Sequence, residues 1–309
     1  MKFTITKYGK PVIHCSLQNL DLLAWDSLWV YHPSFISFKH SYYLFYTGRN
    51  MSISRIGMGI NDNIGVAISK NLKEWKKMKD PVIRRGKDGD WDSEFLAHCF
   101  VFKDRKKFYM LYDGSKKGEW LESIGLAEST NLTEWKKYKD NPIFRVSKNW
   151  WEKRHVSRCC IFKERDLYYL YYAGHDGERE RIGMAKGRTL FTLSRFLDDP
   201  IIDVGKKNDW DERSISDPRV IKYKDRYLMF YSGIDKKGIE RAGLAISKDL
   251  FSWKKYKKNP ILDVSASSWD KISAARADIK MFSNRLYIFY SGRKNFFYNI
   301  GIADLEIQK

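Results

Sequence analysis

The sequence predicts an all-β protein built as a five-bladed β-propeller, and three observations lead to this prediction. A Trp-acid pair recurs along the chain, an aromatic run that ends in a small residue and glycine follows each pair, and a second glycine-containing segment comes next. The five pairs begin at Trp25, Trp91, Trp151, Trp210 and Trp269, so successive copies lie 66, 60, 59 and 59 residues apart. Self-similarity at such a spacing indicates a repeat architecture.

The elements of one repeat can be assigned in order. Its aromatic run predicts a strand, with copies at residues 42–48, 108–114, 167–174, 227–233 and 286–292. Its second segment predicts the next strand, with copies at residues 64–69, 124–129, 182–187, 242–247 and 300–305. Short aromatic or β-branched runs bounded by turn residues are typical of strands, and no segment keeps a helical period. Four strands in each of five units predict radial blades.

A step of proline and two apolar residues ends most units and predicts how the chain closes. It begins at Pro81, Pro142, Pro200 and Pro260, and also at Pro11, before the first Trp-acid pair. The last unit lacks this step. We therefore expect the N-terminal segment to supply the outer strand of the fifth blade, so that residues 1–309 form a single domain without an open sheet edge.

The composition excludes several classes of protein. The 309 residues include 57 Lys and Arg against 38 Asp and Glu, which gives a formal charge of +19 and an isoelectric point near 9.6. A hydrophobic fraction of 43% argues against disorder, and neither a membrane-spanning apolar run nor a signal-peptide pattern is present. Four cysteines without metal or disulfide spacing suit core thiols in a reducing compartment. We expect a soluble, cytoplasmic protein.

Five residues at equivalent positions predict where a ligand binds. Each lies fourteen residues before the last tyrosine of an aromatic run: His32, His98, Arg158, Asp217 and Arg276. The innermost strand of a blade begins near the axis, so these side chains can converge there. Because buried charges must be paired or remain solvated, we interpret the five as a polar pocket that tolerates an anion. A salt-bridge ring between Asp217 and the two arginines is the structural alternative.

Four further residues stand out against their repeats. Glu94, four residues before His98, and Asp113, which replaces the Thr, Ala or Ser of the other copies, are candidate catalytic carboxylates. The alternative without a catalytic role is that Glu94 is an ordinary surface residue and that Asp113 stabilises a turn. His155 and Trp29 occupy one equivalent position, where an aromatic ring can stack on a sugar or pack at the rim.

We expect neither a metal nor another cofactor. The histidines show no local ligand spacing, and the neighbouring arginines would repel a cation.

Repeated strings such as GLAESTNLTEWKKYKDNPI (125–143) and GLAISKDLFSWKKYKKNPI (243–261) resemble the five-bladed propeller glycosidases, which include glycoside hydrolase families 43, 32, 68, 117 and 130. The resemblance covers essentially the whole chain and implies a carbohydrate-active enzyme. Families 43 and 32 place three carboxylates at the starts of inner strands, because glycoside cleavage uses one protonated and one ionised carboxyl. Here those positions hold His32, His98 and Arg158, with His32 where family 32 has the acid of an Asp-Pro step.

A second resemblance concerns Asp217-Pro218-Arg219, which is similar to the Asp-Pro-Arg segment of family 130. The aspartate of that segment is the family's general acid, so the resemblance implies that Asp217 donates a proton and that Arg219 contributes to substrate binding. Family 130 includes phosphorylases, and basic side chains such as His32, His98, Arg158 and Arg276 would suit phosphate. In that family the segment lies in an early blade, whereas Asp217 belongs to the fourth unit.

These observations predict a carbohydrate-active enzyme that cleaves or transfers a glycosyl group, with an Asp general acid and a basic, anion-tolerant site. The alternatives are a phosphorylase or glycosyltransferase that uses phosphate or a phosphorylated sugar, and a noncatalytic glycan-binding propeller. Lysine clusters at residues 75–79, 135–139 and 253–258 form a basic perimeter that would suit an acidic glycan or an anionic surface. No nucleic-acid motif accompanies these lysine clusters. We therefore expect the lysines to be solvated on the protein surface, without a specific nucleic-acid partner.

Overall fold

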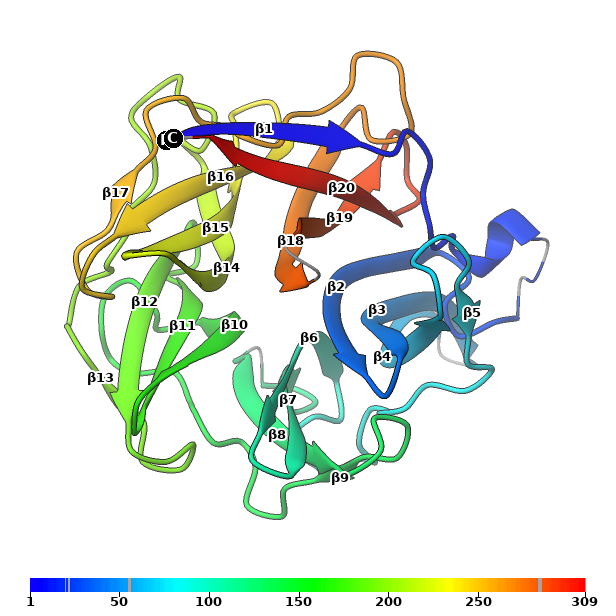
Figure 1. The fold of residues 1–309 in the computed structure, drawn as a ribbon. Coiled ribbons are helices and arrows are strands. Elements are labelled where there is room, and N and C mark those ends of the chain that lie inside the picture. Colours follow the sequence, from blue (N-terminus) through cyan, green and yellow to red (C-terminus); the bar gives the residue numbers. More distant parts are fainter. Residues whose placement is uncertain (20, 22, 55–56, 120, 283–284, 309) are drawn as a thin grey trace.

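The computed structural model describes residues 1–309 apart from residues 20, 22, 55, 56, 120, 283, 284 and 309. Within the described residues the protein is all-β, with one 3-10 turn, η1 (Ser16–Asn19), and no α-helix. No helix in this part of the chain is long and apolar enough to cross a membrane. Figure 1 shows the strands gathered in groups around a common centre.

The strands form four-stranded antiparallel groups that follow the sequence repeat. The first group is β2 (Trp29–Phe38), β3 (Ser41–Ser54), β4 (Gly57–Ser69) and β5 (Lys76–Lys77). The second is β6 (Phe95–Asp104), β7 (Lys107–Ser115), β8 (Ser123–Ser129) and β9 (Lys136–Lys137). The third is β10 (His155–Glu164), β11 (Leu167–His175), β12 (Glu180–Gly187) and β13 (Ser194–Arg195).

The last two groups are joined into one eight-stranded sheet. The fourth group is β14 (Ser214–Tyr223), β15 (Arg226–Ile234), β16 (Glu240–Ser247) and β17 (Lys254–Lys255). The fifth is β18 (Ser273–Phe282), β19 (Arg285–Arg293), β20 (Asn299–Gln308) and β1 (Lys2–Lys7). A short parallel pairing of β16 with β18, from Glu240↔Ser273 to Arg241↔Ala274, links the two groups.

The N-terminal strand completes the last group, as the sequence predicts. β1 pairs antiparallel with β20 from Lys2↔Gln308 to Lys7↔Ala303, and Figure 1 shows the two strands side by side. The residue Ile13 of the first Pro-apolar-apolar step then bridges Ile300. The other steps make equivalent bridges to the third strand of their own groups: Ile64↔Ile83, Ile124↔Phe144, Ile182↔Ile202 and Ala242↔Leu262.

The first strand of each group lies nearest the common centre in Figure 1. Strands β2, β6, β10, β14 and β18 each contact the next one, and β18 contacts β2 in turn. The hydrophobic core lies between adjacent groups: one cluster joins Leu44 of β3 to Phe289 of β19. All four cysteines are buried and none forms a disulfide. The starts of five strands from distant parts of the sequence are therefore brought together.

The acid of each Trp-acid pair is a buried structural group. It accepts a hydrogen bond from the last tyrosine of the aromatic run, at 2.7 to 3.3 Å: Tyr46–Asp26, Tyr112–Asp92, Tyr172–Glu152, Tyr231–Asp211 and Tyr290–Asp270. It also pairs with a cation from an outer strand: Lys77, Lys137, Arg195, Lys255 and Lys7, in the same order. One lysine of each cluster therefore holds its own sheet together.

The tryptophan explains why two glycines recur in every repeat. The Trp91 ring lies against Gly114 of β7 and Gly125 of β8, and a Cβ on Gly125 would come within 2.4 Å of the ring. The same approach recurs in the other four repeats. Because a tryptophan ring is held by its own packing, alanine at such a position would force a rearrangement.

We expect Lys7→Met to destabilise the protein, because it removes the cation that pairs with buried Asp270 at 2.6 Å and ties β1 to the last group. Lys7 is 20% exposed, so the loss should be about 1–3 kcal/mol, below that of a fully buried pair. Denaturant unfolding measures it. Lys10→Met, at an exposed residue, is the control, and equal stability of the two variants would contradict the role of Lys7.

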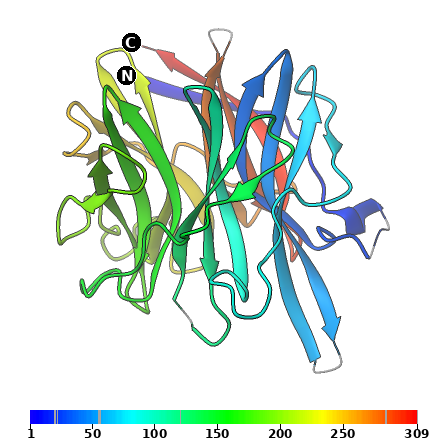
Figure 2. The same cartoon turned by 90° about the horizontal axis from the view of Figure 1, so that it is seen from below.

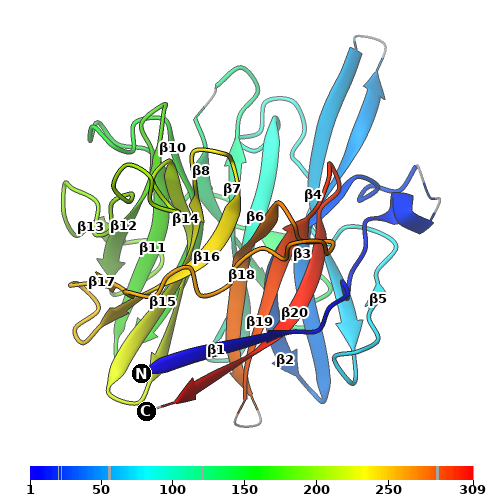
Figure 3. The same ribbon diagram turned by 90° about the horizontal axis from the view of Figure 1, so that it is seen from above.

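The hairpin of β3 and β4 continues beyond the body of its sheet, as Figures 2 and 3 show. Its backbone pairing runs from Arg49↔Asp62 to Ser54↔Gly57. Arg49 also lies opposite Trp29, the first residue of β2. The hairpin therefore projects from the side of the protein on which the innermost strands begin.

Candidate active site

The five equivalent residues predicted to face the centre occupy one backbone conformation. His32, His98, Arg158, Asp217 and Arg276 all have a positive φ between 49° and 55°. Each lies at a shift in the pairing of its strand with the next one, for example between Tyr31 and Ser34. A bulge redirects side chains locally, and a positive φ is costly for residues other than glycine. The spacing argument therefore identified a repeated structural position.

A hydrogen bond from the preceding group holds four of these bulges. The side chain that comes just before the glycine of an aromatic run accepts the backbone N–H of the bulge residue, at 2.7 to 2.9 Å. The pairs are His32–Ser291, His98–Thr47, Arg158–Asp113 and Arg276–Ser232. In the remaining group the acceptor position is Ala173, which has no side-chain acceptor. The position of Asp113 thus has a structural function in every repeat that carries an oxygen there.

The centre opens toward solvent on the side where the innermost strands begin. The side chains of Arg158 and Glu122 are 23% and 20% exposed, respectively. Farther along the strands, Arg219 and Asp278 are 4% and 1% exposed. A ligand that approaches from the side of the β3–β4 hairpin therefore meets Arg158 and Arg276, which are 23% and 18% exposed, whereas His32, His98 and Asp217 are buried beneath them.

A second set of equivalent residues, not predicted from the sequence, lies at this opening. Three residues before the glycine of each third-strand segment stand Asp62, Glu122, Glu180, Glu240 and Tyr298. Four of the five are acids, and this spacing was the signal that would have found them. They begin, or lie close to the start of, the body of the third strand, so they lie beside the bulge residues.

These acids neutralise the arginines of the site. Arg158 forms an ion pair with Glu180, and Arg276 forms one with Glu240 at 3.0 Å. Arg49 binds Asp62 with two hydrogen bonds of 2.6 and 2.7 Å. The arginines therefore pair with third-strand acids, not with Asp217 as the salt-bridge alternative supposed. The centre is therefore a polar site in which the arginines have carboxylate partners, and its tolerance of an anion stays a prediction.

Asp217 lies deep in the site against His32. Its Oδ1 is 2.9 Å from His32 Nδ1, its Oδ2 accepts a hydrogen bond from Ser216, and its side chain is 2% exposed. Burial would raise the pKa of Asp217, but the contact with His32 and the nearby Arg158 and Arg276 outweigh it and hold the pKa well below the usual range. A carboxyl in that state is ionised at neutral pH. This does not suit the proton-donor role that the sequence analysis assigned to Asp217.

His98 and Asp113 form a second buried pair. Their Nδ1 and Oδ2 atoms are 2.7 Å apart, and the pKa of Asp113 is raised well above its usual value, chiefly by burial and then by Glu122. Burial lowers the pKa of both His98 and His32, so both rings are neutral at neutral pH. Asp113 Oδ1 is buried without a hydrogen-bond partner. Burial therefore makes an ionised carboxylate costly at Asp113.

His98, Asp113 and Glu122 each place one donor atom within 4.8 Å of the others. Among the described residues, this group has the geometry to hold a cation. Arg158 acts on both carboxyl groups, and its positive charge would repel a cation there. The same proximity lets the two carboxyl groups share protons. The expected absence of a metal stays a prediction.

Glu122 combines access with a raised pKa. Burial raises the pKa of its carboxyl above the usual value, and Arg158 counteracts this only in part. Its Oε1 lies 3.6 Å from Nδ1 of His155, whose pKa is lowered to about 4 by burial, Arg158 and Arg154. Arg158 and His175 lower the pKa of Glu122 but do not cancel the effect of burial. Glu122 is thus a partly exposed acid whose pKa lies above its usual value.

Two predicted site residues differ from the others in their surroundings. Glu94 is exposed and directly precedes β6, where its backbone N–H donates a hydrogen bond to the Ser115 carbonyl and its own carbonyl accepts one from the Arg85 guanidinium. Arg219 is buried beneath the ring, where its guanidinium donates hydrogen bonds to the carbonyl oxygens of Cys159 and Pro218. It therefore lies on the packed side of the bulges, and its role in substrate binding stays a prediction.

Trp29 and His155 lie at the rim, as their equivalence predicted. The Arg49 guanidinium is 4.2 Å from the Trp29 ring centroid, and the Trp29 ring contacts those of Tyr31 and Tyr298 at 5.6 and 5.2 Å. The His155 ring contacts His175 at 5.1 Å. Both residues are therefore packed, and both lie beside the acids of the opening.

We expect Asp113→Asn to change the pH dependence of stability. A carboxyl whose pKa is raised on folding stabilises most below its unfolded pKa, near 4, and loses that contribution as the pH rises through the folded pKa. The melting temperatures of variant and parent should therefore be similar at pH 4 to 5, and the variant should melt higher, by about 2 °C or more, at pH 9. Scanning calorimetry across this range measures the difference, and a variant less stable at every pH would refute the protonated state.

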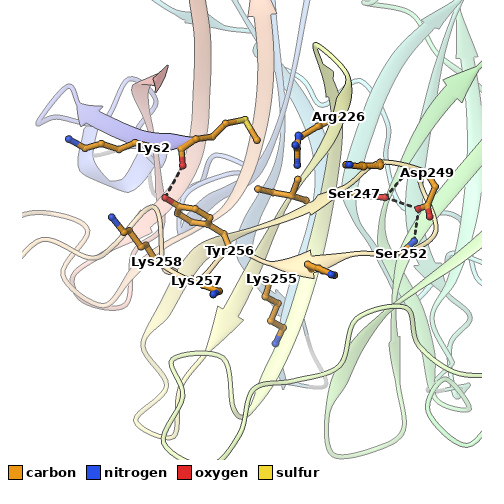
Figure 4. A pocket seen from close by; sticks show the side chains of 13 residues that line it. Lys2, Arg226, Ser247, Asp249, Ser252, Lys255, Tyr256, Lys257 and Lys258 are labelled. Carbon is orange, nitrogen blue, oxygen red and sulfur yellow. Dashed lines mark hydrogen bonds between the residues drawn. The ribbon is translucent and has the colours of Figure 1, made fainter. Parts of the chain in front are cut away.

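The basic perimeter has a hollow at β17 and the N-terminus, shown in Figure 4. Its cavity volume is about 680 Å³, and basic side chains dominate its lining: Lys2, Arg226, Lys248, Lys254, Lys255, Lys257 and Lys258. Asp249, its acid, accepts hydrogen bonds from the backbone of Phe251 and Ser252. Lys255 pairs with Asp211, so part of this charge is structural.

Two curated proteins have sequences similar to parts of this chain. No family model matches the chain. It is 27% identical over 138 residues to a 1,2-β-oligomannan phosphorylase of Thermoanaerobacter sp. strain X514, which covers 41% of this chain and 45% of that protein. It is also 27% identical over 213 residues to an uncharacterised protein of Mycobacterium tuberculosis strain CDC 1551, which covers 66% of each. The matched segments span less than two thirds of either relative.

Solved structures match over nearly the whole chain. One of them aligns with a TM-score of 0.76 at 16% identity, and the alignment covers 97% of this chain and 93% of that one. Its description reads that the GH130 family of mannoside phosphorylases contains glycoside hydrolases that target β-1,2 mannosidic linkages in Candida mannan. A thermostable family 43 glycoside hydrolase aligns with a TM-score of 0.71 at 20% identity and covers 91% and 90%. The fold is therefore that of the propeller glycosidases.

Proposed function

We propose that residues 1–309 form a single closed five-bladed β-propeller and that its central site cleaves glycosidic bonds in a neutral glycan. The observation that carries this proposal is the pair Glu122 and Glu240, two equivalent acids whose surroundings move their pKa values in opposite directions. Glycoside cleavage uses one protonated and one ionised carboxyl, and such divergent environments assign the two roles. The second and fourth groups supply these acids, so they approach the centre from different sides.

In this proposal Glu122 donates the proton to the leaving oxygen. Asp113 and His98, whose donor atoms lie within 4.8 Å of the Glu122 carboxyl, supply a reserve of protons. Glu240 is the ionised carboxylate: burial alone would raise its pKa, but Arg276 and hydrogen bonds from Ser273 and Tyr298 lower it. Asp217 positions His32, so it acts through another residue.

The substrate we propose is a β-1,2-linked oligomannan, acted on without a cofactor. The similarity to a 1,2-β-oligomannan phosphorylase and to the family 130 structure supports this choice. The compensated arginines favour a neutral sugar over an anionic one, because Arg158 and Arg276 already have carboxylate partners. We propose a cytoplasmic location, and contact of the basic perimeter with an anionic surface as a secondary property.

Phosphorolysis is the second candidate, and the phosphorylase relative favours it. Arg158 is 23% exposed, so phosphate could approach it by competing with Glu180. In that case inorganic phosphate, not water, would attack the sugar after Glu122 had protonated the leaving oxygen.

The test is incubation with β-1,2-mannooligosaccharides of two to six units, with and without inorganic phosphate, followed by separation of the products. Free mannose or shorter oligomers without phosphate would support hydrolysis. A mannosyl phosphate formed only with phosphate would support phosphorolysis. Binding of the series with no product would support a noncatalytic glycan-binding propeller, and absence of both binding and product would overturn the proposed function.

A further inference from the structure

Phe296 is an exposed aromatic residue at the opening of the central site. It lies in the connection between β19 and β20, and 57% of its surface is exposed. Its ring lies 5.4 Å from that of Trp29, the first residue of β2. The backbone N–H of Phe297 donates a hydrogen bond to the Asn295 side chain, which fixes the local turn. An exposed phenylalanine in this defined position is available to a ligand.

A continuous series of ring contacts leads from Phe296 to the buried centre. Trp29 contacts Tyr298 at 5.2 Å, and Tyr298 contacts Tyr31 at 5.8 Å. Tyr31 then contacts the rings of His32 and His98 at 4.9 and 6.1 Å. The exposed end of this aromatic wall is Phe296, and its inner end is the pair of bulge histidines.

Polar groups accompany the wall and hold it in place. Arg49 lies over the Trp29 ring, binds Asp62 through two nitrogen atoms, and donates a hydrogen bond to the hydroxyl of Tyr31. Tyr298 donates a hydrogen bond to Glu240, and the backbone N–H of Val30 donates one to the Tyr298 carbonyl. Tyr31 and Tyr298 are buried, so a ligand can reach this wall only at its outer end, Phe296 and Trp29, and the inner rings serve to hold that end in place. An exposed aromatic ring beside fixed polar groups suits an amphipathic ligand such as a sugar ring.

We propose that Phe296, supported by Trp29, forms an outer sugar-binding subsite that contacts a sugar unit at least one residue away from the cleaved bond. This inference rests on the proposed function and deepens it, because it makes the protein selective for oligosaccharides over disaccharides. The reason is positional: Glu122 and Glu240 lie beside the bulge residues, whereas Phe296 lies at the solvent end of the wall. A disaccharide held across the two acids would leave Phe296 uncovered.

The test compares the parent with Phe296→Ala on β-1,2-mannooligosaccharides of two to six units, by initial rates, or by calorimetric titration where no cleavage occurs. We expect KM or Kd to rise about fivefold to tenfold for the longest substrates, with little change for the disaccharide and none in kcat. Phe296→Tyr should restore the parent's values. Phe191→Ala is the matched control, because Phe191 is 54% exposed but packs on Tyr138 at the periphery.

The outcomes separate this inference from the proposed function. If the parent acts on the series and Phe296→Ala keeps the parent's dependence on chain length, the subsite is refuted and the proposed function stands. An equal loss for all lengths, or an equal loss in Phe191→Ala, would also refute it. If the parent neither binds nor cleaves any member of the series, the proposed function and the subsite fall together.

Discussion

Glu122→Gln is expected to lower kcat/KM for any oligosaccharide that the parent cleaves by about a thousandfold. General acid catalysis contributes roughly 10²- to 10⁴-fold, and an amide keeps the shape of the side chain but supplies no proton of comparable acidity. The parent's carboxyl has the two properties that this role needs, because its pKa is raised by burial and its side chain is 20% exposed at the opening. Initial rates under saturating and limiting substrate measure the loss.

Two further measurements distinguish a lost proton donor from a damaged site. The rate of an aryl mannoside with a good leaving group should fall much less, because that group departs with little protonation. The parent's rate should also decline at high pH as Glu122 ionises, whereas the variant's residual rate should lack that decline.

The matched control is Glu128→Gln, because Glu128 lies on β8, the strand that directly follows Glu122, and pairs with Lys107 on the outside of the protein. It should keep the parent's rate and melting temperature. A Glu122→Gln variant with parental rates would remove Glu122 from the mechanism, and one with a collapsed melting temperature would assign it a structural role.

The fold could be predicted because the same packing arrangement is encoded in each of the five sequence repeats. Trp91, its two glycines and the Tyr112–Asp92 hydrogen bond recur in equivalent form in every group, so a single repeat already implies the others. Counting from those landmarks located the bulge residues, because a strand has a fixed rise for each residue. The partner of the N-terminal strand also followed, since the last repeat lacked its closing step.

The site was harder to predict because its chemistry depends on pairs that are distant in the sequence. Arg158 and Glu180 come from the inner and third strands of one group, whereas Arg276 reaches across to Glu240 of the preceding group. Neither pairing follows from a motif. The Asp-Pro-Arg resemblance placed Asp217 correctly in space, but it could not reveal the neighbours that set its pKa. The direction of Arg219 depends on the bulge just before it, which no spacing rule describes.

Asp217→Asn is expected to destabilise the protein by about 1–3 kcal/mol at neutral pH, because the buried His32 ring loses its hydrogen bond to an ionised carboxylate. The two groups are 2.9 Å apart, and both side chains are at most 2% exposed. Unfolding by guanidinium chloride at pH 7 measures the loss. A proton donor would behave differently, since its amide variant would lose turnover and keep its stability.

The pH dependence of this difference gives the sharper test. Because the pKa of Asp217 is lower in the folded protein than in the unfolded chain, its stabilising contribution is complete above the unfolded value near 4 and is lost progressively as the pH falls. The gap in unfolding free energy between parent and Asp217→Asn should therefore be constant from pH 6 to 8 and should shrink below about pH 5. Ser216→Ala, which removes only the hydroxyl that bonds Oδ2, should cost less and keep the parent's pH dependence. A gap that does not narrow in acid would mean that Asp217 carries no charge in the folded protein, and the proton-donor role would then return to Asp217.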